Sequence, residues 1–235
     1  MPRSGVNKLQ VGRSVYDFYM IEWAGIDPEN GDPLWYKDEV DANKNPTGKR
    51  VTTNDYGSAD YYYVDKSSLP KVYGGFNTSL SWKGFDLSAI FAYSIGGYIY
   101  NRDVTMILHN GSLEGRDWST EILRRWTPDN RYTDVPALST TSNNWNSAST
   151  RFLQNNSYMR LKNLTLSYNL PKQWISKLSL SSVQVYVQGD NLFTIHRNQG
   201  LDPEQGITGS TYYRYPDMRT ISGGINVSFY IQTKL

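Results

Sequence analysis

Residues 163 to 170 alternate strictly between polar and apolar side chains. Odd positions are polar and even positions are apolar, in the order Asn163, Leu164, Thr165, Leu166, Ser167, Tyr168, Asn169 and Leu170. Because successive side chains of a strand point to opposite faces, the segment predicts a strand with one wet face and one apolar face. Two structures contain such strands. A soluble sheet packs the apolar face on a core, whereas a membrane barrel turns that face to lipid and its polar face to a wet lumen.

The composition of the chain leaves both structures open. The 235 residues suffice for one large all-β domain or two small ones, and 14% are aromatic, with 19 Tyr and 7 Trp. A mean hydropathy of -0.59 argues against a transmembrane helix, but half of each barrel strand faces water, so a barrel remains compatible with it. A formal charge of +2 without a Lys/Arg cluster predicts no nucleic-acid partner, and zero cysteine excludes a disulfide scaffold.

Residues 72 to 94 predict an antiparallel hairpin. Apolar residues occupy alternate positions before a two-residue turn at Lys83-Gly84, and alternate positions after it are again apolar. Trp82 and Phe85 flank the turn. In a soluble sheet they would belong to the core, and in a barrel they would lie in the aromatic girdle beside a short periplasmic turn.

The rest of the chain predicts further strands separated by connections of two lengths. Strands are expected near 14–23, 34–36, 61–64, 183–193 and 219–230, a short helix at Trp118–Trp126, and one helical turn at Lys172–Leu178. Residues 38–60, 101–150 and 200–216 are polar or rich in Gly and Pro, and predict loops. The sum is about seven or eight strands with alternating short turns and long loops, which is typical of an antiparallel transmembrane β-barrel segment with long extracellular loops.

Nine stretches, in order along nearly the whole chain, resemble the C-terminal part of the SusC/RagA family of TonB-dependent outer-membrane transporters. The block Ser157–Leu164, followed by Asp190–Phe193, is the most specific of them. The stretches are Val11–Ser14, Trp23–Gly31, Pro70–Asn77, Trp82–Leu87, Arg125–Pro128, Ser157–Leu164, Tyr186–Phe193, Gly200–Glu204 and Gly223–Phe229.

The resemblance implies an outer-membrane barrel with an internal plug, energised by TonB. It also implies a SusD-like surface lipoprotein as partner, and import of oligosaccharides or peptides. Such barrels have about 22 strands and a plugged lumen, of which residues 1–235 would be the C-terminal third. The plug, the segment that contacts TonB and the export signal would precede Met1, because Met1–Lys8 has no apolar signal-peptide region.

A partial barrel has two open edges whose unpaired N–H and C=O groups each cost several kcal/mol in lipid. We therefore expect the chain to be a fragment of a longer transporter. Family members end on the aromatic residue of the last strand, whereas here Tyr230–Leu235 follow Phe229.

No catalytic constellation occurs in the sequence. His109 and His196 are far apart without the carboxylate spacing of a zinc site, and no Gly-x-Ser-x-Gly elbow is present. The sequence therefore predicts neither an enzyme nor a cofactor or metal site.

Ligand binding is the stronger prediction. Aromatic side chains that stack on sugar rings, with polar groups around them, are the expected recognition elements. The candidates lie in the two long loops and are Trp118, Trp126, Trp145, Tyr212, Tyr213 and Tyr215. The alternative role of these side chains is to pack the loops against each other.

Two other functions remain open from the sequence. One is a soluble secreted all-β glycan-binding module, and the other is a TonB-dependent receptor for an iron chelate. The first differs from a barrel in one observable respect. A soluble module buries Leu164, Leu166, Val185 and Val187 in a core, whereas a barrel leaves them on its outside.

Overall fold

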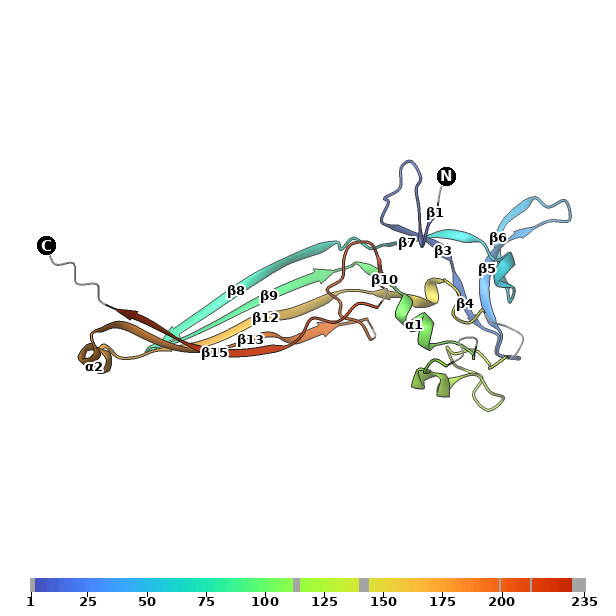
Figure 1. Ribbon diagram of the computed structural model, residues 1–235. Helices are drawn as coiled ribbons and strands as arrows, with labels where there is room; N and C mark the ends of the chain where they lie inside the picture. Colours follow the sequence, from blue (N-terminus) through green and yellow to red (C-terminus); the bar gives the residue numbers. More distant parts are fainter. Residues whose placement is uncertain (1–2, 112–114, 140–143, 199, 212, 230–235) are drawn as a thin grey trace.

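The computed structural model describes residues 3–111, 115–139, 144–198, 200–211 and 213–229. Two parts are visible in Figure 1: one long curved sheet, which we call the wall, and a region of short strands and loops, which we call the head (residues 3–71 and 96–157). Residues 197–219, the return loop, connect two wall strands. The strands pair mostly antiparallel, so the predicted all-β class is confirmed.

The wall contains five long strands that neighbour one another in chain order. They are β8 (Val72–Trp82), β9 (Phe85–Ile95), β12 (Tyr158–Asn169), β13 (Leu180–His196) and β15 (Thr220–Phe229). The predicted 72–94 hairpin is present, with Trp82 opposite Phe85. Lys83 and Gly84 both have positive φ, 47° and 88°, as a type I′ hairpin turn requires.

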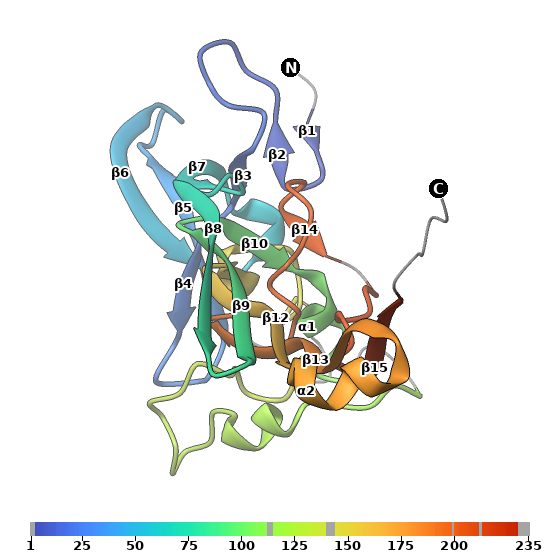
Figure 2. The ribbon, with the colours of Figure 1, turned by 90° about the vertical axis from the view of Figure 1, so that its left-hand side faces the viewer.

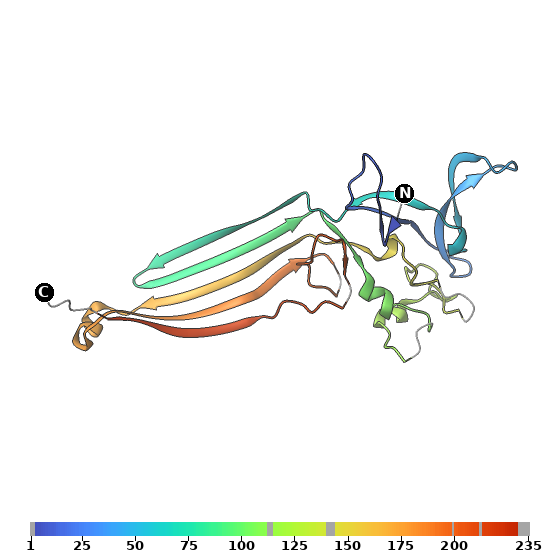
Figure 3. The same ribbon diagram turned by 45° about the horizontal axis from the view of Figure 1, so that its top comes forward.

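The wall connections are sorted by length. At one end lie the two-residue turn and the short link of α2 (Lys172–Ile175) and η4 (Ser176–Leu178), which the sequence predicted as one helical turn. At the opposite end lie the long connections, residues 96–157 and the return loop (Figures 1 and 3). The final residues, Tyr230–Leu235, lie outside the described residues.

The strand register separates the wall into an apolar and a polar face. Phe76 pairs with Phe91, Leu80 with Leu87, and Leu166 with both Leu87 and Val187, so these side chains share one face. The opposite face carries polar side chains. One row of cross-strand partners on that face consists of Ser79, Ser88, Thr165, Gln188 and Ser222. The wall is therefore amphipathic across its full width, as the alternation in single strands predicted.

The head is built from small sheets and short helices. Its strands and helices are β1 (Arg3–Ser4), β2 (Asn7–Lys8), β3 (Asp17–Ile21), β4 (Trp23–Ile26), β5 (Pro33–Val40), β6 (Pro46–Thr53), η1 (Tyr56–Ser58), β7 (Tyr61–Ser67), β10 (Tyr98–Asn101), α1 (Arg102–Ile107), η2 (Thr120–Arg124), η3 (Thr150–Phe152) and β11 (Leu153–Asn155). The return loop adds β14 (Ser210–Thr211), which pairs parallel with β10.

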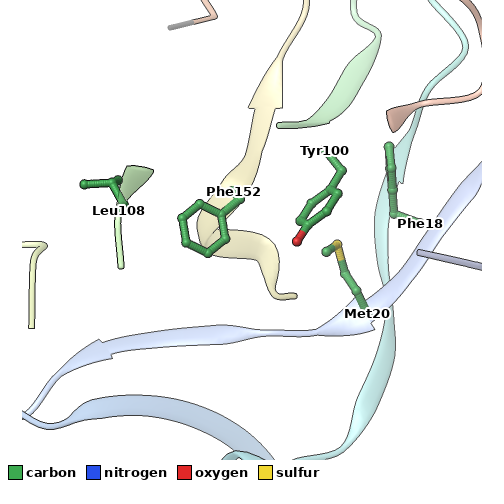
Figure 4. Close-up of a cluster of buried hydrophobic side chains, with 5 residues drawn as sticks. All are labelled: Phe18, Met20, Tyr100, Leu108 and Phe152. Carbon is green, nitrogen blue, oxygen red and sulfur yellow. The ribbon is translucent and has the colours of Figure 1, made fainter. Parts of the chain in front are cut away.

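The main hydrophobic core lies in the head. Phe18 and Met20 of β3 meet Tyr100, Leu108 and Phe152, all almost fully buried (Figure 4). Trp145 forms a second cluster with Ile122 and Val135. Among the wall residues described, Ala89 alone is a buried hydrophobic side chain, so the wall is a single layer rather than half of a packed sandwich.

Two local predictions were wrong. Residues 38–60, predicted as a loop, contain the end of β5 and all of β6, which pair as a polar hairpin. Residues 38–53 of the hairpin are mostly exposed and do not alternate between polar and apolar, so no period-two pattern predicts these strands; only the base of the hairpin, with Trp35, is buried. Its turn is instead held by the Asp41 carboxylate, which accepts from the backbone N–H groups of Asn43 and Asn45 at 2.8 Å each. The predicted Trp118–Trp126 helix is only the 3₁₀ turn Thr120–Arg124.

None of the helices in the described part of the chain has the length and apolar content needed to cross a membrane.

Candidate functional site

The polar face of the wall carries rows of hydrogen-bonded side chains that cross from strand to strand. Asn169 donates to the Asp86 carboxylate at 2.7 Å, Gln184 donates to Ser167 at 3.2 Å, and Asn226 donates to Gln184 at 3.2 Å. These rows couple four neighbouring strands through side chains as well as through the backbone ladder. The polar face is therefore an ordered, water-compatible surface.

Arg160 is the most deeply buried charged residue of this face, at 3% exposed. Its guanidinium donates to three carboxylates: to Asp202 at 2.6 Å, to Glu204 at 2.9 Å and to Asp217 at 3.1 Å. Its Nε donates to the Thr194 hydroxyl at 3.0 Å. All three carboxylates belong to the return loop, so one wall residue holds both arms of that loop.

A second cation, Lys162, lies beside Arg160 at a bulge in β12. The register slips between Leu161 and Asn163, which leaves Lys162 as the extra residue relative to β9. The Lys162 ammonium lies 2.7 and 2.9 Å from the two Glu204 carboxylate oxygens. Arg160 and Lys162 are two residues apart and would share a face without the bulge, but Asn163 would then point outward. The bulge therefore brings Asn163 to the polar face, where it donates to Asp190 at 2.7 Å.

The return loop is shaped around Asp202. One Asp202 oxygen accepts the backbone N–H of Glu204 at 2.9 Å, and the other accepts that of Asp217 at 2.9 Å. Burial by itself raises the pKa of this carboxyl, but these N–H groups and Arg160 outweigh burial, and the pKa is lowered from 3.8. Figure 2 shows the wall strands along an arc with the return loop on its concave side, in agreement with the contacts of Arg160.

One cleft adjoins the Arg160 cluster, and a second lies in the head. The first, of ≈ 660 Å³, lies between β13 and the return loop and is lined by Arg160, His196, Asp202, Arg214, Asp217 and Arg219 among others. The second, of ≈ 790 Å³, is lined by Ile26, Leu123, Arg131 and Tyr132 among others. Both are open, and polar and apolar atoms line them in about equal parts.

The structure divides the predicted aromatic residues into two groups. Trp145 is 1% exposed, and its carbonyl accepts from Arg151 at 3.0 Å, whose burial lowers its pKa to about 10. Trp126 packs against Gly31, where a Cβ would lie 2.6 Å from its ring, and donates from Nε1 to the Pro28 carbonyl at 3.1 Å. Both side chains therefore pack segments of the head against one another.

The second group is accessible. Trp118 is exposed and meets the His109 ring edge-on, with centroids 5.4 Å apart. The Tyr213 hydroxyl accepts from Arg116 at 3.0 Å, so the loops that carry Trp118 and Tyr213 are brought together. Tyr215 is 93% exposed next to the first cleft. Tyr212 lies outside the described residues.

Sequence reasoning missed the Arg160 cluster and the exposed Tyr132. A signal for the cluster is nevertheless present in the sequence. The block Ser157–Leu164 places two cations, Arg160 and Lys162, two residues apart, and the block Gly200–Glu204 places two carboxylates at the same spacing. This complementary spacing indicates that the two segments could pair. His109 lies in a loop and is fully buried. Within the described ranges, no group of three or more His, Cys, Asp or Glu residues is placed to hold a metal ion.

The chain is similar in sequence to several TonB-dependent receptors. It is 30% identical over 236 residues to a protein named TonB-dependent receptor P3 from Formosa agariphila, covering 94% of this chain and 23% of that protein. It is 26% identical over 227 residues to TonB-dependent receptor SusC from Bacteroides thetaiotaomicron, covering 95% of this chain and 20% of that one. No family model matches the sequence.

Solved structures match the fold as well as the sequence. A structure of the RagAB peptide transporter superposes with a TM-score of 0.77 at 37% identity, over 91% of this chain and 23% of that chain. The RagAB peptide importer in its open-open state gives the same TM-score at 36% identity, over 91% and 22%. The chain thus spans about a fifth to a quarter of the length of the proteins it matches.

Replacing Arg160 with Leu is expected to release the return loop. Removal of one partner from a buried charge cluster costs about 3 kcal/mol, or roughly a hundredfold in the opening equilibrium, since Asp202 would keep a buried charge without its cation. Hydrogen–deuterium exchange of residues 200–211 in the full-length protein measures this. Arg124→Leu is the matched control, because Arg124 pairs with Glu121 and Asp134 on the surface, where such pairs contribute less than about 1 kcal/mol. Equal protection in both variants would contradict the role of Arg160.

The same exchange experiment has an expected pH dependence. The pKa of Asp202 is lower in the folded state than its ordinary value of 3.8, so its stabilising contribution is present above that value and is lost as pH falls through the folded pKa. Protection of residues 200–211, corrected for intrinsic exchange, should therefore be constant from neutral pH to pH values just above 3.8 and fall below it. Asp202→Asn should remove the transition. A loss of protection at near-neutral pH would show that another group controls the loop.

Proposed function

We propose that this chain, which is related in sequence and in fold to the SusC/RagA type of TonB-dependent receptor, forms part of the barrel wall and extracellular loops of an outer-membrane transporter. Residues 1–235 are in this proposal the C-terminal part of that barrel. The complete receptor imports oligosaccharides or peptides together with a SusD-like surface lipoprotein, and TonB supplies the energy.

The exposed apolar face of the wall carries the proposal. Leu166, Val185 and Val187 are 42%, 42% and 48% exposed, where a soluble module would bury them. The whole chain exposes 15403 Å² of surface, whereas a compact monomer of its mass exposes about 10,800 Å². Soluble monomers do not leave a face of this extent in water, so lipid is the solvent that fits it.

The polar face and the sorted connections fit the same assignment. In an outer-membrane barrel the lumen is polar, the periplasmic turns are short and the extracellular loops are long. The wall has its hydrogen-bonded rows on the concave side, its short turns at one end, and the head and return loop at the other end. The head is accordingly extracellular, and the return loop lies over the lumen at its extracellular mouth.

Both outer edges of the wall need a partner. β8 and β15 are the terminal strands of the five-stranded sheet, with 11 and 10 residues, and each pairs with one wall neighbour. Unpaired backbone groups along such edges are costly in lipid. The remaining strands of the receptor would pair with these edges, which accords with a chain that covers about a quarter of its relatives.

The substrate is proposed as an oligosaccharide or a peptide, with the peptide favoured by the 37% identity to the RagAB peptide transporter. The exposed aromatic residues Trp118, Tyr213 and Tyr215 are the proposed contacts. Tyr213 and Tyr215 flank the first cleft, where Arg214 and Arg219 supply cations and Asp217 supplies an anion. Charges of both signs suit the termini and side chains of a peptide.

A pair of neighbouring substitutions tests the orientation of the wall. Val187→Arg places a cation on the apolar face and should cost about 2–4 kcal/mol in lipid, which lowers the amount of folded receptor in the outer-membrane fraction. Gln188→Arg places the same cation on the polar face, where Gln188 already donates to Asp190 at 3.1 Å, and should leave that amount unchanged. If Val187→Arg were neutral and Gln188→Arg harmful, the faces would be assigned the wrong way round.

Tyr215→Ala is expected to lower uptake about fivefold to tenfold, because truncation of a tyrosine that is a hot spot of a binding site costs more than about 1 kcal/mol. The probes are a labelled protein digest and a labelled dextrin mixture, supplied to cells that carry the full-length receptor. Tyr132→Ala removes an equally exposed tyrosine from the other cleft and should not change uptake. Unchanged uptake by both Tyr215→Ala and Trp118→Ala, at normal surface levels, would remove these residues from the substrate site.

A further inference from the structure

The apolar face of the wall contains a groove. It has a volume of ≈ 320 Å³, and its lining includes Leu87, Leu164, Leu166, Val187, Leu192 and Ile221. The floor of the groove is glycine. Gly189 lies opposite Leu164 on one side and Ile221 on the other, and Gly223 lies opposite Val187, so two of the outward positions carry no side chain.

The groove is a built feature of the strand register. β13 has an irregularity between Asp190 and Phe193, where Asn191 has a φ of 53°. This irregularity folds Leu192 under Gly189, and a Cβ at position 189 would lie 2.7 Å from both Leu192 methyl carbons. A side chain at position 189 would therefore displace Leu192, which lines the groove beside Gly189.

The short-turn end of the wall carries exposed lysines with no acidic residue beside them in sequence. Lys172 and Lys177 lie in the link that joins β12 to β13, the strands that supply most of the groove lining. Lys83 lies in the β8–β9 turn, whose Gly84 carbonyl accepts from the Asn169 backbone N–H. All three are exposed, and residues 82–85 and 170–182 contain no Asp or Glu. The nearby Asp86 faces the opposite side, where it accepts from Asn169. The positive charge of this end is thus uncompensated by neighbours in sequence.

Aromatic residues surround these lysines. Trp82 and Trp174 are 65% and 63% exposed, and the Lys83 ammonium lies 5.0 Å from the centre of the Trp82 ring. Tryptophan at the boundary between hydrocarbon and headgroups is typical of membrane proteins, and lysine extends from there to the headgroups. The lysines therefore mark the headgroup level of the bilayer leaflet at the short-turn end.

The separation between the groove and the lysines matches one leaflet. From Leu166 and Val187 to the last backbone hydrogen bond between their strands at this end, which the Leu170 N–H donates to the Val183 carbonyl, is four residues along each strand, or about 13 Å at roughly 3.3 Å per residue. Half of the hydrocarbon core of a bilayer is about 15 Å. An acyl chain whose headgroup rests among the lysines thus reaches the groove without bending.

We propose that the groove and Lys83, Lys172 and Lys177 together bind one anionic phospholipid in the periplasmic leaflet. The lysines contact its phosphate and anionic headgroup, and the groove receives an acyl chain. The proposal rests on the proposed function, since it takes the apolar face to be lipid-facing. A free phosphate would use the lysines but not the groove, and a zwitterionic lipid would use the groove but gain little from three cations.

The test is native mass spectrometry of the detergent-solubilised full-length receptor, titrated with phosphatidylglycerol and with phosphatidylcholine of the same acyl chains. The wild type should bind phosphatidylglycerol at least about tenfold more tightly, as expected for several lysines near an anionic headgroup. The triple variant K83Q/K172Q/K177Q should lose this preference and keep the phosphatidylcholine affinity. L166W should weaken both lipids by filling the groove.

Matched controls separate the site from general effects. K37Q/K44Q/K49Q removes three lysines from the β5–β6 hairpin of the head, one of them, like Lys83, at positive φ, and should change nothing. L80W adds the same bulk on the apolar face outside the groove and should also be silent. Equal affinity of the wild type for both lipids, or unchanged phosphatidylglycerol binding in the triple lysine variant, would overturn the proposal. Absence of the receptor from the outer-membrane fraction would instead overturn the proposed function.

Discussion

The wall depends on one constraint: a single-layer sheet has no core, so its stability must come from strand pairing and from the solvents on its two faces. Backbone ladders join its five strands, and rows such as Ser167–Gln184–Asn226 add side-chain hydrogen bonds on the wet side. Contact with water does not stabilise the apolar face. The head solves the problem differently, with Phe18, Met20 and Phe152 in a conventional core. The two parts of the chain therefore require different surroundings, and the membrane boundary would run between them.

Arg160 links the two parts. It stands on a wall strand, and its three carboxylate partners lie in the return loop, whose strand β14 pairs with β10 of the head. A charge cluster of this kind is a weak source of net stability, because burial offsets most of the attraction. Its effect is geometric: it determines where the return loop lies.

The sequence predicted the wall better than the head, for a physical reason. In the wall each strand has one wet and one apolar side, so the side chains from Leu164 to Leu170 alternate between apolar and polar, and that alternation predicts the strand. The pair Lys83-Gly84 likewise predicts the two-residue turn. In the head, burial follows from contacts between distant segments. Nothing local distinguishes the buried Trp145 from the exposed Trp118, and neither the polar β5–β6 hairpin nor α1 has a periodic signal. The carboxylates of Arg160 lie more than 40 residues away in sequence, beyond any local pattern.

The departures from regular register explain why both candidate sites lie where they do. At the level of Leu161–Asn163, β12 gains one residue relative to β9, and β13 gains one relative to β12. The first extra residue is Lys162, which joins Arg160 on the polar face. The second lies at Asn191-Leu192, and it turns Leu192 under Gly189 on the apolar face. One irregular layer of the wall thus adjoins the charge cluster on one side and the apolar groove on the other. A regular ladder would keep Lys162 beside Arg160, but it would turn Asn163 to the apolar face and would not bring Leu192 to Gly189.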